Sequence, residues 1–318
     1  MQVTEHLKEL NGKRAFSVEI LPPLKGENIQ DIFQALDPMM EFKPSFIDVT
    51  YHREECEFRE MANGLWEKKV IRKRPGTVGI CAALQNRFHI DAVPHVLCGG
   101  FTKEDTENLL IDLNFLGIDN VVALRGDAIK SETYFKPQKE GHANADTLVL
   151  QIANQNRGVY LDDELQNKTK TNFCIGVAGY PEKHMESPNL ATDIAYLKRK
   201  VDNGADYIIT QMFFDNNAFF QFVEQCRLAG ITVPIIPGLK PLTTKRQLNI
   251  IPHRFHVDLP ADLASAIEQS DAKDAVRQIG AEWMIQQSKE LYEAGFNLIH
   301  FYTMGKTDAI CRLAKELL

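Results

Sequence analysis

The hydrophobic positions of the chain fall into short runs rich in β-branched residues, and longer stretches with helical spacing separate these runs. The runs lie at residues 15–21, 46–51, 90–98, 120–127, 173–181, 206–215, 231–239 and 297–304. Nearly continuous apolar strands that alternate with helices are typical of parallel sheets buried on both faces. Eight such units predict a closed (β/α)8 TIM barrel of the α/β class, with an open doubly wound sheet as the alternative.

Several helix boundaries can be read between the strands. Thr102 and Asp105 have the spacing of a capping box, and Gly117 follows the apolar pattern that they begin. We also expect a short N-terminal helix over residues 1–13 and a longer insert, with an extra helix or lid, over residues 240–296. No repeat, linker or low-complexity tract divides the chain, so we expect residues 1–318 to form one barrel domain.

Composition and charge narrow the class of protein. With 44% hydrophobic and 25% charged residues, the chain has the composition of an ordinary globular protein. Its net charge of -7 and the lack of a long basic block argue against sequence-independent binding of nucleic acid or of anionic membranes. We find no signal peptide, no apolar run long enough to span a membrane and no C-x-x-C spacing among the 6 cysteines, so we expect a cytosolic protein with reduced thiols.

Polar residues recur late in the predicted strands. They are Glu19, Thr50, His95, Asp127, Tyr180, Gln211 and Thr303. In (β/α)8 barrels the active site lies at the carboxyl ends of the strands, so these side chains would meet at one rim. Glu19 stands out because it interrupts an apolar run just before Pro22, and an ionised carboxylate in apolar surroundings needs a partner or a shifted pKa.

Four polar residues also have a simpler interpretation. His95 could be a core histidine with its hydrogen bonds satisfied, and Asp127 could cap the following helix. Gln211 could bond to the backbone at the end of its strand, and Lys200 could lie on a solvated helix face.

Two familiar nucleotide-binding signatures do not occur in the sequence. There is no G-x-x-x-x-G-K-[ST] loop and no G-x-G-x-x-G fingerprint, so a nucleotide cofactor would be held by rim loops and helix ends. His253 and His256 have a spacing that suits a metal, but no acidic third ligand lies nearby in the sequence, and we expect no metal site.

Taken in order, eight sequence blocks resemble one known family. They are FSVEILPP, FIDVTY, VPHVLC, VVALRGD, GVAGYPEKH, LKRKVDNGADYIITQMFFD, IIPGLKPL and HFYTM, and they span residues 15–304. The chain resembles the 5,10-methylenetetrahydrofolate reductases, in the single-domain form typical of bacteria. The resemblance implies a barrel that binds FAD, takes electrons from NAD(P)H and reduces methylenetetrahydrofolate to 5-methyltetrahydrofolate by a ping-pong scheme. It also implies a homo-oligomer, a dimer or a tetramer.

The resemblance assigns roles to individual residues. Glu19 matches the general acid, Asp127 matches the aspartate beside flavin and pterin, and Gln211 matches the pterin-binding glutamine. The FAD-binding positions that it implies are Thr50, Tyr51, His95, Arg125, Gly126, Asp127, Asn144, Ala145, Tyr180, His184, Asp193 and Lys200.

The chain departs from the family pattern at three positions. Asn144 replaces a flavin-contacting tyrosine, Lys245 replaces a phenylalanine that stacks on the folate, and Lys306 replaces an arginine that binds the folate tail. Lysine neither stacks as an aromatic ring does nor offers a bidentate fork. Two other functions stay open from the sequence: another FAD-dependent barrel enzyme of the proline-dehydrogenase type, and a non-catalytic folate-binding barrel.

Overall fold

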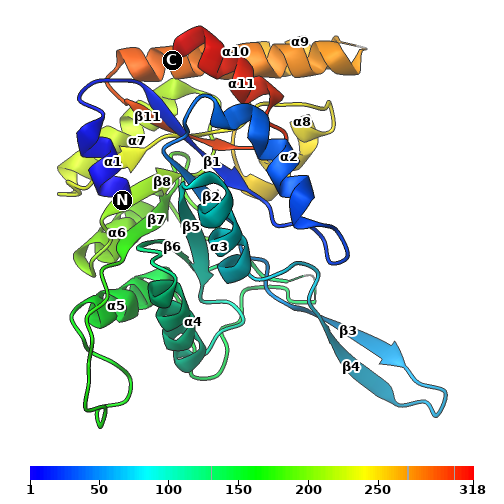
Figure 1. The fold of residues 1–318 in the computed structure, drawn as a ribbon. Helices are drawn as coiled ribbons and strands as arrows, with labels where there is room; N and C mark the ends of the chain where they lie inside the picture. Colours follow the sequence, from blue (N-terminus) through cyan, green and yellow to red (C-terminus); the bar gives the residue numbers. More distant parts are fainter. Residues whose placement is uncertain (130, 271, 304) are drawn as a thin grey trace.

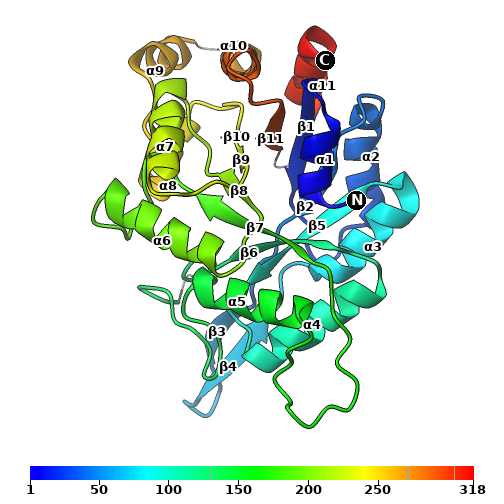
Figure 2. The same cartoon turned by 90° about the vertical axis from the view of Figure 1, so that its left-hand side faces the viewer.

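The computed structural model describes residues 1–129, 131–270, 272–303 and 305–318, and its centre is a ring of parallel strands enclosed by helices (Figures 1 and 2). The strands of the ring are β1 (Ala15–Ile20), β2 (Phe46–Val49), β5 (Asp91–Leu97), β6 (Asn120–Leu124), β7 (Cys174–Gly179), β8 (Tyr207–Thr210), β9 (Ile235–Ile236), β10 (Gly238–Leu239) and β11 (Leu298–Tyr302). They are hydrogen-bonded in the order β10-β11-β1-β2-β5-β6-β7-β8-β9. Only Pro237, which has no N–H group, separates β9 from β10, so the two form one interrupted strand that brings the ends of the ring together. The (β/α)8 barrel predicted from the sequence is confirmed.

Each predicted apolar run contains a strand, but most strands end earlier than predicted. The run 206–215 becomes a strand only over Tyr207–Thr210, and Gln211 lies just beyond its end. In the run 231–239, Pro234 and Pro237 limit the ladder to two short pieces, because proline cannot donate a hydrogen bond to a neighbouring strand. The last residue of the run 297–304 lies outside the described residues.

Helices form the outer layer of the barrel. They are α2 (Ile29–Met40), α3 (Thr77–Phe88), α4 (Lys103–Phe115), α5 (Ala145–Asn156), α6 (Leu190–Asp202), α7 (Asn216–Leu228), α10 (Lys273–Glu293) and α11 (Asp308–Leu317). The capping box of α4 is present, since the Thr102 N–H donates to Asp105 Oδ2 at 2.9 Å and the Asp105 N–H donates to Thr102 Oγ1 at 3.0 Å. Within the described parts of the chain, no helix is both long and apolar enough to cross a membrane.

The helices of two regions differ from the prediction. The insert between the seventh and eighth strands adds α8 (Gln247–Phe255) and α9 (Ala261–Glu268) before α10. The N-terminal helix α1 is Val3–Glu9 and is shorter than the predicted 1–13, because Asn11 and Gly12 turn the chain with φ values of 46° and 83°.

A hairpin that the sequence analysis did not predict projects from the barrel (Figure 1). Its strands are β3 (Glu55–Glu60) and β4 (Trp66–Ile71), which pair antiparallel around a turn that contains Asn63 and Gly64. Charged residues interrupt both strands, so neither gives the apolar run that marks the strands of the ring. We call residues 55–71 the β3–β4 arm.

The interior of the barrel changes from apolar to polar along its axis. Near the amino ends of the strands, Phe46, Val93 and Leu298 belong to one buried apolar cluster. Nearer the carboxyl ends, Asp48 and His300 are buried instead. Because side chains alternate between the two faces of each strand, residues that line the interior stand two apart in the sequence.

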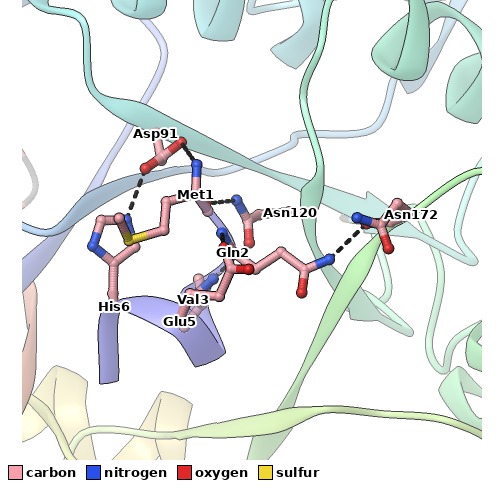
Figure 3. A network of polar contacts seen from close by, with 8 residues as sticks. All are labelled: Met1, Gln2, Val3, Glu5, His6, Asp91, Asn120 and Asn172. Atoms are coloured by element: carbon pink, nitrogen blue, oxygen red, sulfur yellow. Dashed lines mark hydrogen bonds and ion pairs between the residues drawn. The ribbon is translucent and has the colours of Figure 1, made fainter. Parts of the chain in front are cut away.

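Helix α1 closes the amino-terminal end of the barrel (Figure 3). Val3 is buried in the interior apolar cluster, and its N–H donates to Asn120 Oδ1 at 2.8 Å. The Asn120 amide in turn donates to the Met1 carbonyl at 2.9 Å. Asp91 accepts from the Met1 amine at 2.8 Å and lies 2.7 Å from the His6 ring. A short helix that would be unstable alone is therefore held by the strand ends.

We expect Asp91→Ala to loosen this closure. Although burial opposes ionisation of Asp91, its bonds with His6 and the terminal amine hold its pKa below the usual value. Its stabilising effect is therefore present at neutral pH and is lost as the pH falls through the lowered pKa. Urea unfolding should show a loss of about 1–2 kcal/mol at pH 7 and a smaller loss in acid. Asp37→Ala, which breaks an exposed pair with Arg87, is the control; an equal effect there would contradict this role.

Candidate active site

Glu19 lies at the carboxyl edge of the ring and points into the barrel. Phe16, Val18 and Ile20 of the same strand belong to the apolar cluster between strands and helices, so alternation turns Glu19 inward. The Thr303 hydroxyl donates to the Glu19 carbonyl at 2.8 Å and fixes the end of β1 against the chain after β11. The Glu19 carboxylate therefore stands on a rigid strand.

The surroundings of Glu19 favour its protonated form more than water does. Its side chain is 16% exposed, and burial raises its pKa to about 7. The positive charges of His95 and Lys240 lower this pKa, while the negative charge of Asp48 raises it. Near neutral pH the carboxyl group is therefore present in both protonation states, which is the condition for a general acid.

His95 lies between two carboxylates. Its Nε2 is 3.7 Å from Glu19 Oε2 and 3.6 Å from Asp48 Oδ2. Burial lowers the pKa of His95, but the contacts with Asp48 and Glu19 outweigh burial and raise it overall. The imidazole thus gains a proton more readily than it would in water. Because it is also buried beside Asp48, the alternative of a core histidine with its hydrogen bonds satisfied stays open.

Asp48 was missed by the sequence analysis. Its side chain is 1% exposed, and its Cα is the direct partner of Glu19 in the β1–β2 ladder. The signal was the one that singled out Glu19, an acid inside an apolar run, but Asp48 stands in the middle of its run and looked less like a rim residue.

Below Asp48 the polar residues continue toward the base of the barrel. His300 Nε2 is 4.0 Å from Asp48 Oδ2, and His300 Nδ1 is 2.9 Å from the Ser17 hydroxyl. Burial lowers the pKa of His300 to about 4, so this ring is neutral at pH 7. Of the two histidines, His95 is therefore the one whose pKa the neighbouring carboxylates raise above its ordinary value.

A second group of predicted residues gathers where β7 meets α6. The rings of Tyr180 and His184 are 4.8 Å apart, and the His184 N–H donates to Asp193 Oδ2 at 3.1 Å. The Lys200 ammonium donates to the Ala178 carbonyl at 2.6 Å, and burial lowers its pKa to about 8. Lys200 is therefore turned toward the strand end, in contrast to the alternative of a solvated helix face.

The loop after β6 contributes Arg125 and Gly126. Arg125 forms a bidentate pair with Glu186, with one N–H···O distance of 2.8 Å, and lies 5.0 Å from the centre of the Phe135 ring. Gly126 has φ of 82°, a conformation that disfavours a Cβ, and a Cβ there would lie 3.3 Å from Leu97.

Asp127 follows them and is exposed. Helix α5 does not begin until Ala145, so Asp127 does not cap it, and the helix-cap alternative is wrong. After burial, the charge of Asp127 is the next largest cause of the raised pKa of Tyr180, which places the carboxylate near the β7 group.

The remaining flavin-binding candidates lie along the same edge. Thr50 Oγ1 donates to the Ile20 carbonyl at 3.3 Å, and the rings of Tyr51 and Phe101 are 5.1 Å apart. Asn144 is the N-cap residue of α5, and Ala145 is its first residue.

The predicted folate-binding residues are less closely grouped. Gln211 shares a shallow depression with Tyr180 and Phe255, and its side chain accepts from the Met212 N–H at 2.9 Å, which is the backbone bond expected as its simpler interpretation. Lys245 donates to the Glu268 carbonyl at 2.9 Å in α9, and Lys306 is exposed in the loop after β11.

Two further titratable groups escaped the sequence analysis. Lys240 follows β10, acts electrostatically on Glu19 and has a pKa lowered to about 8 by burial. Glu182 has a pKa raised to about 7 by burial, and its carboxylate accepts from the Asp258 N–H at 2.6 Å. Both follow strand ends, which is the signal that could have found them.

The fold and the edge residues define a (β/α)8 barrel with a candidate active site at the carboxyl ends of its strands. The model of the family "Methylenetetrahydrofolate reductase" matches residues 2–317, and the chain belongs to this family.

Known relatives differ in length. The chain is 30% identical to "5,10-methylenetetrahydrofolate reductase" of Escherichia coli, covering 97% of this chain and 93% of the relative. It is 31% identical to "Methylenetetrahydrofolate reductase (NADH) 1" of Arabidopsis thaliana over 96% of this chain but 49% of the relative. The chain thus spans about half the length of the plant relatives it matches.

A solved structure shares the fold. A Clostridium thermocellum protein described as binding two copies of 5-methyl-5,6,7,8-tetrahydrofolic acid superposes with a TM-score of 0.59 at 13% identity, covering 99% of this chain and 98% of that one.

We expect His95→Gln to raise the pKa of Glu19. The positive charge of His95 favours the ionised carboxylate, so its removal should move this pKa upward by about one unit. Infrared difference spectra of the carboxyl band across a pH titration, with Glu19→Gln as the blank, measure the change. His253→Gln, at an exposed site on α8, should leave the titration unchanged. An unchanged or lowered pKa in His95→Gln would contradict the assigned charge.

Proposed function

We propose that this protein reduces 5,10-methylenetetrahydrofolate to 5-methyltetrahydrofolate with NAD(P)H, through bound FAD. The observation that carries the proposal is Glu19, a carboxyl group of pKa about 7 at the carboxyl edge of a barrel of this family. The names of the relatives support the reaction, and they include forms named for NADH and for NADPH.

The residues along the edge fit FAD by their chemistry. Arg125, Lys200 and His184 supply cationic or donor groups suited to a pyrophosphate. Tyr51 and Tyr180 supply aromatic surface, and Gly126 lets the backbone turn without a side chain in the way. When bound, FAD supplies hydride transfer between the nicotinamide and the folate.

The first step that the protein's own residues supply is a proton transfer. The methylene bridge of the substrate joins two nitrogens, and it must open to a cationic iminium before a hydride can add. Glu19 donates its proton to the departing nitrogen. The C–N bond to that nitrogen breaks, and the nitrogen keeps the electron pair of the bond. Asp127 holds a negative charge that stabilises the cation, and the Gln211 amide both donates to and accepts from the pterin.

His95 and Asp48 set the charge of this site. After proton transfer Glu19 is an anion, and the His95 imidazolium 3.7 Å away stabilises it. Each turnover consumes NAD(P)H, one proton and methylenetetrahydrofolate, so Glu19 regains one proton from solvent in each cycle.

In the ping-pong scheme, NAD(P)H binds and leaves before the folate binds at the same face. The homo-oligomer, the single domain over residues 1–318 and the cytosolic location stay predictions. Lys245 and Lys306 replace the stacking and forked side chains of the family, so we expect weaker contacts with the folate ring and tail than those residues give.

Purified protein should carry or bind FAD, with absorbance near ~450 nm. NADH and NADPH should each be tested for anaerobic bleaching of this band, followed by its recovery with methylenetetrahydrofolate. Bleaching by proline but not by NAD(P)H would support a proline-dehydrogenase-like enzyme. Folate binding without flavin would support a non-catalytic barrel, and it would end the proposal.

Glu19→Gln should separate the two half-reactions. Flavin reduction by NAD(P)H should stay near the wild-type rate, while reoxidation by methylenetetrahydrofolate should slow by about 10²–10⁴-fold, because the proton donor is gone. Glu182→Gln is the matched control, since Glu182 has the same raised pKa. Loss of folate reduction in Glu182→Gln with activity retained in Glu19→Gln would assign the acid to Glu182 instead.

The folate half-reaction should also depend on pH. Only protonated Glu19 donates, so the rate should be constant in acid and fall tenfold per pH unit above about 7. Single-turnover reoxidation rates across the pH range test this, and a rate that rises with pH would contradict the role of Glu19.

A further inference from the structure

A cavity of about 480 Å³ lies between the start of α7, the second half of α10 and the loop that joins α8 to α9. None of the residues that line it belongs to a strand of the ring or to the predicted site. Its volume falls within the range of cavities that hold small organic molecules. The cavity is therefore a candidate for a second binding site.

The lining of this cavity is acidic. Asp215, Asp258 and Glu290 supply three carboxyl groups, and no described residue that lines the cavity is basic. Two amides hold the Glu290 side chain, since Asn216 Nδ2 donates to its Oε2 and Gln286 Nε2 donates to its Oε1, each at 2.8 Å. Amide donors carry no net charge, and each carboxylate oxygen can accept a further hydrogen bond. These contacts position Glu290 without neutralising it.

Glu182 adjoins the cavity, because its carboxylate accepts from the Asp258 N–H at 2.6 Å. Burial is the largest cause of the raised pKa of Glu182, and the bond with the Asp258 N–H opposes it. The two charges that act on Glu182, those of Asp258 and Asp215, are both negative and raise its pKa further. The potential at this end of the cavity is therefore negative, while Glu290 lies on the α10 side.

Aromatic rings form part of the wall. Trp283 and Phe220 both line the cavity, and Trp283 Nε1 donates to the Phe214 carbonyl at 3.0 Å, which fixes the indole. The face of an aromatic ring attracts a cation that lies within about 6 Å of its centre. The described residues contain no group of three or more His, Cys, Asp or Glu side chains that could hold a metal ion. Aromatic faces beside separated carboxylates thus suit an organic cation.

We propose that this cavity binds an aliphatic dication, a compound in which a short chain of CH₂ groups joins two ammonium or guanidinium groups. One cationic group contacts Glu290 and the face of Trp283. The other contacts Asp215 and Asp258, and the CH₂ chain packs on Phe220. A neutral ligand would leave all of the carboxylates uncompensated, and a monocation would compensate only one end of the cavity.

Tryptophan fluorescence tests the proposal with or without bound flavin and without folate, so its result is independent of the proposed reaction. The chain has 2 tryptophans, and Trp66 is 64% exposed on the β3–β4 arm, so Trp66→Phe leaves Trp283 as the reporter. Diaminobutane should change the Trp283 emission to saturation, with a dissociation constant of about 1 mM or lower. Butylamine, which has one charge, should bind at least about tenfold more weakly, and butanediol should leave the emission unchanged.

Two variants, both made with Trp66→Phe, separate this site from general attraction to an acidic protein. Glu290→Gln keeps the shape of the side chain but removes its charge, and it should raise the dissociation constant of diaminobutane at least about tenfold. Glu293→Gln, at an exposed position further along α10 that does not line the cavity, changes the net charge equally and should leave binding unchanged. No saturable change at millimolar diaminobutane, equal binding of butylamine or butanediol, or equal losses in the two variants would each overturn the proposal.

Discussion

Two carboxylates on neighbouring strands point into the same barrel, and the site depends on the one imidazole that separates them. Glu19 and Asp48 are Cα partners in a parallel ladder, and both side chains face inward. Without a cation between them, the buried charges would repel one another and each would be costly to desolvate. His95, within 3.7 Å of both, makes the arrangement stable and leaves Glu19 close to half protonated at neutral pH.

The edge of the barrel has two regions that differ in the kind of side chain they carry. Around β1, β2 and β5 the groups are Glu19, Asp48 and His95, and the pKa values of Glu19 and His95 are raised. Around β6, β7 and α6 the side chains are arginine, lysine and histidine groups matched to fixed anions, with Arg125 paired to Glu186 and Lys200 near Asp193. In the proposed reaction, the first region would supply the proton and the second would face the phosphates of the cofactor.

The sequence predicted the strands of the ring well because burial on both faces leaves an uninterrupted apolar run, which is a local signal. It also predicted Glu19, since a charge inside such a run is conspicuous. Asp48 gives the same local signal, an acid inside an apolar run, but its place in the middle of the run did not show that it meets His95, a partner far away in the sequence. The β3–β4 arm was missed because its strands are exposed on both faces, so charged residues break the alternation that marks a half-buried strand. Lys245 was predicted to replace a stacking residue, and only the structure shows it bonded to the end of α9.

The closure of the barrel by α1 has a consequence for the order of folding. The Val3 N–H and its acceptor on Asn120 are 117 residues apart, and the seven residues of α1 are too few to form a lasting helix in water. This segment must therefore wait until β5 and β6 have been made and have docked before it gains any stable structure. Contacts that close so long a loop are entropically expensive and form late. The N-terminal helix is thus expected to become ordered only after the first half of the barrel has folded.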